Sequence, residues 1–264
     1  MREKIQSPQN QNIKLAASLK QKKYREETGL FLVEGVRLVE EVLASDWFCE
    51  SIFVADSFGG QERSAALLKQ AEECSHVYEV SEALLAKISD TREPQGIVAI
   101  VKQKEQALPK AGANPFWVLA DGIQDPGNLG TLIRTADAAG CDGVLLIQSV
   151  DVYNPKVVRA SMGSLFHLPV LSAEADLILQ WLQAEQISLY GTSVENAVSY
   201  YNVDWRPSCC IAFGNEGQGM SSFVKKYCDG FVHIPLIGKA ESLNVSISAA
   251  VILYEALRQR RFSS

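Results

Sequence analysis

The sequence lacks an apolar stretch that could cross a membrane. No run among its 264 residues approaches the roughly 18 apolar residues that span a bilayer. The start, MREKIQSPQNQNIK, has no apolar segment typical of a secretory signal. With 47% hydrophobic and 21% charged residues, the composition is that of a packed soluble protein. We therefore expect a cytoplasmic protein without membrane contact.

Cysteine is present but is not arranged for metal or disulfide chemistry. The six cysteines form no CxxC pair and show no His spacing that suits zinc. A chain of this length does not depend on disulfides for its stability. We expect reduced, mostly buried thiols and no metal ion.

Two familiar nucleotide-binding signatures are also missing. The stretch DPGNLGTLIRTADAAG, residues 125–140, contains glycines at 127, 130 and 140. Their spacing does not give GxGxxG, and no GK[ST] follows at Walker spacing. An α/β enzyme that uses a dinucleotide is therefore disfavoured, and a cofactor-binding test would decide the question.

Positive charge is scarce overall but concentrated at both ends of the chain. The net charge of −6 argues against a general nucleic-acid coat protein. Residues 1–25 nevertheless hold seven bases and one acid, and Arg258, Arg260 and Arg261 lie near the end. The basic part includes a predicted helix over about 12–25, whose charges form either an RNA-binding surface or an ordinary solvated face.

Alternating patterns predict two α/β domains. In the first part, helices near 36–44, 61–73 and 81–88 alternate with the apolar runs GLFLVEG, ESIFVAD, HVYEV and GIVAIVK. A polar segment with two prolines, 102–115, then interrupts the periodicity and indicates a linker. We place a first domain at 1–106, the linker at 107–114 and a second domain at 115–264.

The second part contains five short apolar runs separated by helical segments: FWVLA, GVLLI, ISLYGT, CCIAF and FVHIPL. This pattern is typical of a mainly parallel sheet covered on both faces. Such sheets bind ligands beyond the carboxyl ends of their strands. Unusual residues follow four of these runs: Asp121, Gly191–Ser193, Gly214–Glu216 and Pro235–Gly238.

Two turns in this part have competing interpretations. In the first, Gly130, Arg134 and Ala138 share a helix face, so small residues leave the guanidinium unobstructed. The alternative is a surface pair of Arg134 with Asp137. In the second, IAFGNEGQGMSS, three glycines around Glu216 suit either a ligand-binding turn or a tight connection in which Ser221 or Ser222 caps the next helix.

A third segment, IPLIGKAESLNVSISAAVILYEALRQRR, begins at Ile234. From Val245 to Leu257 it is apolar nearly all round, which predicts a helix buried on most faces. Ser242 and Asn244 precede this helix, where capping residues belong. One cap explains only one of them, and a helix start can also receive a polar group of a ligand.

Taken together, these segments resemble a known family. NLGTLIRTADAAG, FGNEGQG and IPLIGKAESLNVSISAAVILYE are similar to the three motifs of the SpoU, or TrmH-type, RNA 2′-O-ribose methyltransferases of the SPOUT superfamily. The resemblance runs from about residue 115 to the end and includes NPKVVRASMGSLFHLPV. The front segment, SPQNQNIKLAASLKQKKYREETGLFLVEGVRLVEEVL, resembles the L30e-like RNA-binding domain that often precedes the catalytic domain.

The resemblance implies an α/β fold with a deep trefoil knot, S-adenosylmethionine as cofactor and a homodimer formed through the catalytic domain. The matched catalytic positions are Asn128, Arg134, Glu216 and Asn244. Gly214, Ile234 and Leu243 match cofactor contacts, and a looser match adds Thr192 and Ser193. We add Leu236 as an apolar contact for the adenine and Ser242 at the start of the last helix.

Roles follow from the chemistry of these groups. The high pKa of arginine makes Arg134 a poor proton acceptor, so we expect it to bind a phosphate and stabilise the developing alkoxide. Glu216 would orient Arg134 or accept the proton, and the two asparagines would fix the sugar and the loop. The expected RNA-binding residues are Lys20, Lys22, Lys23 and Arg25, with Arg159 and Ser161 either contacting RNA or serving only in packing.

The target expected by analogy is 23S ribosomal RNA, because the front domain resembles that of ribosomal RNA enzymes. A transfer RNA methyltransferase is the alternative. A binding protein that keeps the fold without catalysis is disfavoured, because all four catalytic positions carry the family's polar residue. A ribosome-associated RNA-binding factor, in which the front domain does the work, is a further alternative and would bind RNA but not S-adenosylmethionine.

Overall fold

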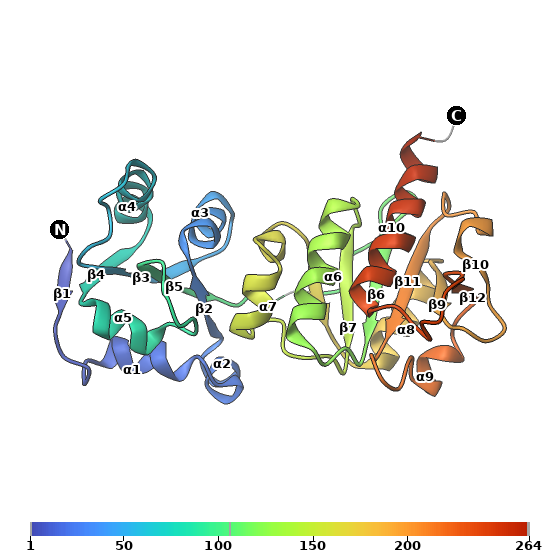
Figure 1. Cartoon of the computed structure of the whole chain (residues 1–264), viewed down its shortest axis with the longest axis horizontal. Helices are drawn as coiled ribbons and strands as arrows, with labels where there is room; N and C mark the ends of the chain where they lie inside the picture. The colour runs from blue at the N-terminus through green and yellow to red at the C-terminus, as the bar shows by residue number, and fades with distance from the viewer. Residues whose placement is uncertain (1, 106, 263–264) are drawn as a thin grey trace. The chain divides into compact units, whose positions relative to one another are not determined.

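The computed structural model describes residues 2–105 and 107–262, which form two compact units (Figure 1). The first unit holds the chain up to Glu105 together with Tyr153–Phe166, and the second holds the rest. Tyr153–Phe166 therefore packs with the front of the chain, although the sequence led us to place it in the second domain. The polar segment between Lys102 and Phe116 contains neither helix nor strand among its described residues.

The first unit is built on a five-stranded mixed sheet. Its strands are β1 (Glu3–Ile5), β2 (Leu30–Glu34), β3 (Cys49–Ala55), β4 (His76–Val80) and β5 (Ile97–Lys102), in the order β1-β4-β3-β5-β2. The first three strands in this order run parallel, and β5 is antiparallel to β3 and β2. Because Val98 and Ile100 of β5 are fully buried beside Phe53 of β3, the apolar runs seen in the sequence form the centre of the core.

Six helices surround this sheet: α1 (Gln11–Ser18), α2 (Lys22–Thr28), α3 (Val36–Ala44), α4 (Glu62–Cys74), α5 (Glu82–Ile88) and α7 (Pro155–Ala160). The three helices predicted from Val36 to Ile88 are confirmed. The single helix predicted over 12–25 is wrong, because the chain breaks into α1 and α2 around the buried Leu19.

Arg25 stabilises the break between α1 and α2. Its side chain is 2% exposed, and its Nη1 donates a 2.8 Å hydrogen bond to the carbonyl of Leu19. The last carbonyls of a helix lack partners within the helix, so a buried guanidinium satisfies one of them. The expectation that Arg25 belongs to an RNA-binding surface is therefore corrected, since this arginine is an internal support.

The second unit contains a seven-stranded sheet in the order β10-β12-β9-β11-β6-β7-β8. Every neighbouring pair is parallel, as predicted. Two strands were missed because they have only two or three residues. The bounds are β6 (Phe116–Asp121), β7 (Gly143–Ile147), β8 (Val170–Ser172), β9 (Ser188–Thr192), β10 (Val198–Ser199), β11 (Cys209–Gly214) and β12 (Gly230–His233).

Helices cover both faces of this sheet (Figure 1). On one face, α8 (Ala175–Ala184) and α9 (Ser222–Lys225) pack on a buried apolar cluster that includes Leu119 and Leu145. On the other face, α6 (Pro126–Ala138) and α10 (Val245–Phe262) lie side by side. The predicted burial of α10 on most faces is confirmed for Val245–Leu257, where only Ile247 and Tyr254, on one face, are exposed, each at 51%.

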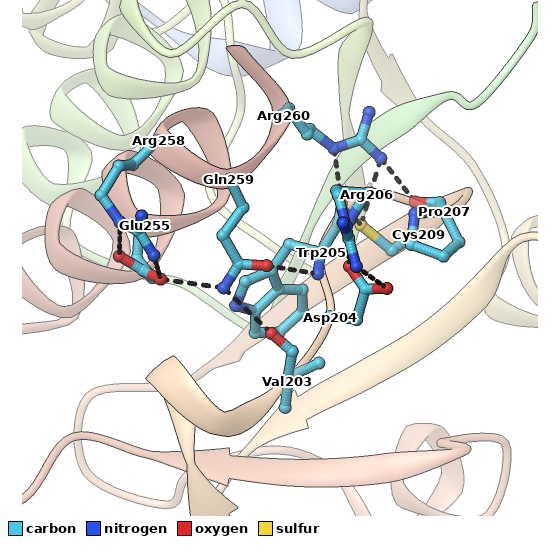
Figure 2. A network of polar contacts seen from close by, with 10 residues as sticks. All are labelled: Val203, Asp204, Trp205, Arg206, Pro207, Cys209, Glu255, Arg258, Gln259 and Arg260. Atoms are coloured by element: carbon cyan, nitrogen blue, oxygen red, sulfur yellow. Dashed lines mark hydrogen bonds and ion pairs between the residues drawn. The ribbon is translucent and has the colours of Figure 1, made fainter. Parts of the chain in front are cut away.

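The end of α10 is fastened to the segment before β11 (Figure 2). The guanidinium of Arg260 donates to the carbonyls of Trp205 at 2.7 Å and Pro207 at 2.6 Å, and lies 4.7 Å from the ring centroid of Phe116. Gln259 accepts from the amide of Trp205 and donates to the carbonyl of Val203. Part of the basic charge near the end of the chain therefore stabilises the fold.

Within the described ranges, no helix is long and apolar enough to span a bilayer. The six cysteines are free, and four of them are buried. The described residues include no group of three or more His, Cys, Asp or Glu side chains arranged to hold a metal ion.

Candidate active site

A cavity of about 670 Å³ opens at the carboxyl edge of the parallel sheet in the second unit. Its walls are the loops that follow β9, β11 and β12, closed by the first turns of α10. Because the strands are parallel, these loops meet at one edge, where sheets of this kind bind ligands. The volume lies within the range of small-molecule sites, about 300 to 1,000 Å³.

All seven residues proposed from the sequence as cofactor contacts line this cavity: Thr192, Ser193, Gly214, Ile234, Leu236, Ser242 and Leu243. Leu236 and Leu243 are each 37% exposed, so apolar surface remains available to a ligand. The hydroxyl of Thr192 donates to the carbonyl of Ala212 at 3.0 Å, which ties the loop after β9 to β11.

Gly214 is required by the turn that forms one wall. A Cβ at this position would lie 2.2 Å from the amide nitrogen of Met220 and 2.4 Å from the carbonyl carbon of Gly219. The turn closes tightly because Asn215 and Gly219 exchange backbone hydrogen bonds of 3.0 and 2.9 Å. The interpretation as a tight connection is confirmed, because Ser221 caps α9. The turn also lines the cavity, which leaves ligand binding as a prediction.

Asn244 caps α10 and also reaches toward α6. Its Oδ1 accepts hydrogen bonds from the amide and hydroxyl of Ser246, at 2.9 and 2.6 Å. Its Nδ2 donates to Oδ1 of Asn128 at 2.9 Å. Asn128 in turn donates through Nδ2 to Oε1 of Glu216, again at 2.9 Å. Three of the four predicted catalytic residues therefore form one hydrogen-bonded series at the cavity.

Glu216 is held as a carboxylate. Burial raises the pKa of Glu216, but hydrogen bonds from Asn128 and from the backbone amides of Glu216, Gln124 and Asp125 outweigh this effect and lower it below the ordinary value. A carboxylate with a lowered pKa is a weak proton acceptor. This result favours a positioning role for Glu216 over the role of general base.

Arg134 lies apart from this series. It is exposed on α6, and no hydrogen bond or ion pair links it to any other residue in the described part of the chain. The alternative pairing with Asp137 is wrong, because the carboxylate of Asp137 lies 3.6 Å from Nδ1 of His167. Glu216 does not orient Arg134 either, since its oxygens accept from Asn128 and from the loop before α6.

Arg159 and Ser161 are engaged within the first unit. Ser161 is fully buried, and its hydroxyl donates to the carbonyl of Val158 at 2.7 Å. Arg159 donates to Asp90 at 2.7 Å and lies 3.8 Å from the buried carboxylate of Glu34. Of the two interpretations, packing is supported for both residues, and contact of the Ser161 side chain with RNA is excluded by its burial.

The three predicted RNA-binding lysines differ in their surroundings. Lys22 and Lys23 are exposed and pair with Glu26 and Glu27 one turn further along α2, at 3.4 and 3.8 Å. Such exposed pairs are weak, so phosphates can displace them. Lys20 donates to the carbonyl of Lys87 at 2.7 Å.

Sequence reasoning assigned no role to two residues that hold the site together. Oδ1 of Asn215 accepts from the amides of Gly217 and Gln218, each at 2.9 Å, while its Nδ2 donates to the carbonyl of Gly122 at 2.8 Å. The amide nitrogen of Gln124 donates to Glu216. An Asn two residues before a glycine is a common turn signal, so Asn215 could have been found. Gln124 acts through its backbone, which carries no sequence signal.

Both units of this chain are similar to proteins of known family. Residues 115–254 match the SpoU rRNA Methylase family, and residues 10–99 match the MRM3-like substrate binding domain. A 23S rRNA (guanosine(2553)-2′-O)-methyltransferase, RlmP of Bacillus subtilis, is 38% identical over 95% of this chain and 97% of its own. A 23S rRNA (uridine(2479)-2′-O)-methyltransferase of Streptomyces viridochromogenes is 32% identical over 89% and 85%.

Solved structures give the same result. An AdoMet-bound rRNA methyltransferase from Sinorhizobium meliloti superimposes with a TM-score of 0.89 at 30% identity. The superposition covers 99% of each chain. The match therefore extends over both units of the fold.

Proposed function

The chain belongs to the SpoU rRNA methylase family, and we propose that it methylates a ribose 2′-hydroxyl of 23S ribosomal RNA. It is an RNA methyltransferase that uses S-adenosylmethionine. The observation that carries the proposal is the series Asn244–Asn128–Glu216, which lies at a cavity lined by every residue expected to contact the cofactor. The proposal also places the enzyme in the cytoplasm with its ribosomal substrate.

The residues that line the cavity suit S-adenosylmethionine. Ile234, Leu236 and Leu243 offer apolar surface for an adenine ring, while the turn at Gly214 allows a close approach to the backbone. When bound there, the cofactor supplies a methyl group that is already electrophilic because it is attached to a sulfonium.

We assign the work of the protein chiefly to positioning and charge. Asn244 and Asn128 hold the start of α10 against the start of α6. The ionised Glu216 accepts hydrogen bonds from the side chain of Asn128 and from the backbone of the loop that precedes α6, and so fixes that loop. This rigid edge would present the ribose at a defined place, which accounts for much of the rate of such reactions.

Arg134 supplies the free cationic group. Its exposed guanidinium is a fork of donors suited to a phosphate oxygen next to the reacting ribose. A bound phosphate there would place a permanent positive charge near the oxygen as it becomes negative. We keep Arg134 as an electrostatic catalyst and not as a proton acceptor.

We further propose a homodimer through the catalytic domain. Ile247 and Tyr254 lie one turn and three turns into α10 on a face that the chain leaves half exposed, and Ile237 in the preceding loop is 95% exposed. A second copy that covers this surface would bury it as oligomeric enzymes do. Light scattering of the purified protein tests this, because a monomer would contradict it.

Competition between RNA substrates tests the proposed target. Unmodified 23S ribosomal RNA and a transfer RNA pool are offered together with S-adenosylmethionine that carries a labelled methyl group. The proposal requires label in the 23S RNA. Label confined to transfer RNA would overturn the target, and binding of ribosomal RNA without cofactor binding would instead indicate an RNA-binding factor.

A further inference from the structure

The wall of the cavity carries more negative than positive charge. Three carboxylates line it, those of Glu195, Glu216 and Glu241, against the single ammonium of Lys225. Glu195 lies in the loop after β9, and Glu241 lies in the loop between β12 and α10. Neither of these two side chains makes an ion pair or a hydrogen bond with any described residue, whereas Glu216 is engaged with Asn128.

The negative charge of the cavity wall matches the cofactor before methyl transfer better than the product after it. S-adenosylmethionine carries a sulfonium, an ammonium and a carboxylate at neutral pH, so it is a net cation. In methyl transfer the electrons of the C–S bond stay on sulfur, the ribose oxygen gains the methyl carbon, and the hydroxyl proton passes to water. The product, S-adenosylhomocysteine, has a neutral thioether and no net charge.

We propose that Glu195 and Glu241 make this cavity select the sulfonium cofactor over its thioether product. The inference rests on the proposed function, since it concerns the same ligand. It gives a role to two residues that are not members of the series Asn244–Asn128–Glu216. The consequence is that the product inhibits less than it would without these two carboxylates, because one positive charge is lost once the methyl group has left.

The expected size of the effect is modest. Both side chains are exposed, so water and salt screen their fields. At a separation of about 8 Å in a water-rich site, one carboxylate changes the affinity for a cation by about two- to fivefold. Two independent carboxylates then multiply to about tenfold.

Binding measurements separate this idea from others. Dissociation constants are measured by calorimetry for S-adenosylmethionine, S-adenosylhomocysteine and sinefungin, an analogue with a protonated amine in place of the sulfonium. The proteins are the wild type, Glu195→Gln, Glu241→Gln and the double variant. Glu174→Gln removes an exposed charge in the same unit but outside the cavity, and it serves as the matched control.

The double variant should lose about tenfold in affinity for the two cationic ligands and less than twofold for S-adenosylhomocysteine. The difference in cofactor affinity between the wild type and the double variant should shrink as the salt concentration is raised. Glu174→Gln should bind all three ligands as the wild type does. Equal losses for all three ligands, or no loss for the cations, would overturn the inference alone. Failure of the wild type to bind any of the three would overturn the proposed function as well.

Discussion

The side-chain amide of Asn244 donates a 2.9 Å hydrogen bond to Oδ1 of Asn128, and the two residues are 116 positions apart in the sequence. The same two residues mark the starts of α10 and α6, since Asn244 caps one helix and Asn128 lies in the first turn of the other. A local capping interaction and a long-range contact are therefore made by one side chain. Through Asn128 the contact extends to Glu216.

Asn128 is the central member of this series, so its loss should affect turnover more than cofactor binding. We expect Asn128→Ala to lower kcat about 100-fold, because a small misplacement of reacting groups costs about that much. The dissociation constant of S-adenosylmethionine should change little, since Asn128 does not line the cavity. Asn202→Ala, at an exposed position in the same unit, is the control for steady-state kinetics and cofactor binding.

Arg134 should behave as a charge with defined geometry. Lysine keeps the charge but cannot form the two parallel hydrogen bonds of a guanidinium, so Arg134→Lys should lower kcat about tenfold or more. Cofactor affinity should stay the same. Arg206→Lys, at an exposed arginine paired with Asp204, is the matched control. Turnover of Arg134→Lys close to that of the wild type would show that the bidentate role is wrong.

The lowered pKa of Glu216 has a consequence for stability at acid pH. A carboxylate whose pKa is lower in the folded than in the unfolded state stabilises the fold above its ordinary value of 4.5. That stabilisation is lost as the pH falls through the lower, folded pKa. We expect the free energy of unfolding of Glu216→Gln to depend less on pH than that of the wild type from 4.5 downward. Parallel curves from denaturant titrations would exclude a lowered pKa.

Substitution of Arg25 should affect stability and not RNA binding, whereas substitution of the lysines of α2 should affect RNA binding and not stability. Arg25→Ala leaves the buried carbonyl of Leu19 without its donor, so the free energy of unfolding should fall by about 1 to 3 kcal/mol. RNA affinity of the folded protein should not change. The double variant Lys22→Ala and Lys23→Ala should keep its stability but bind RNA more weakly. The slope of its RNA affinity against salt concentration, on logarithmic axes, should correspond to about one to two fewer released counterions. Denaturant titration and RNA binding at several salt concentrations distinguish the two.

The fold was predictable where apolar periodicity is strong. The runs that become β6, β7, β9, β11 and β12 are short, apolar and separated by helices, which already indicates a parallel sheet. The break between α1 and α2 was not predictable, because the pattern around Leu19 continues a helix and the burial of Arg25 against the Leu19 carbonyl leaves no signal in that pattern. The exposure of Ile247 and Tyr254 on α10 was not predictable for a related reason. An apolar pattern shows which residues favour burial, but it does not show whether the same chain provides the surface that covers them.

The site was predictable as a set of residues but not as a set of contacts. Motif positions identified Asn128, Glu216 and Asn244, and the parallel topology brought their loops to one edge. The sequence could not show that Glu216 would accept from Asn128 instead of approaching Arg134. That choice depends on backbone amides at Gln124 and Asp125, which any residue type except proline could supply.

The most direct test of the account is the position of the methyl group on the product RNA. RNA labelled from S-adenosylmethionine is hydrolysed with alkali, which needs a free 2′-hydroxyl to cleave the chain. The account predicts label in alkali-resistant dinucleotides, with the amount reduced about 100-fold in Asn128→Ala. Label in ordinary mononucleotides would mean that a base is methylated, and would contradict the assignment of Asn128, Arg134, Glu216 and Asn244 to ribose methylation.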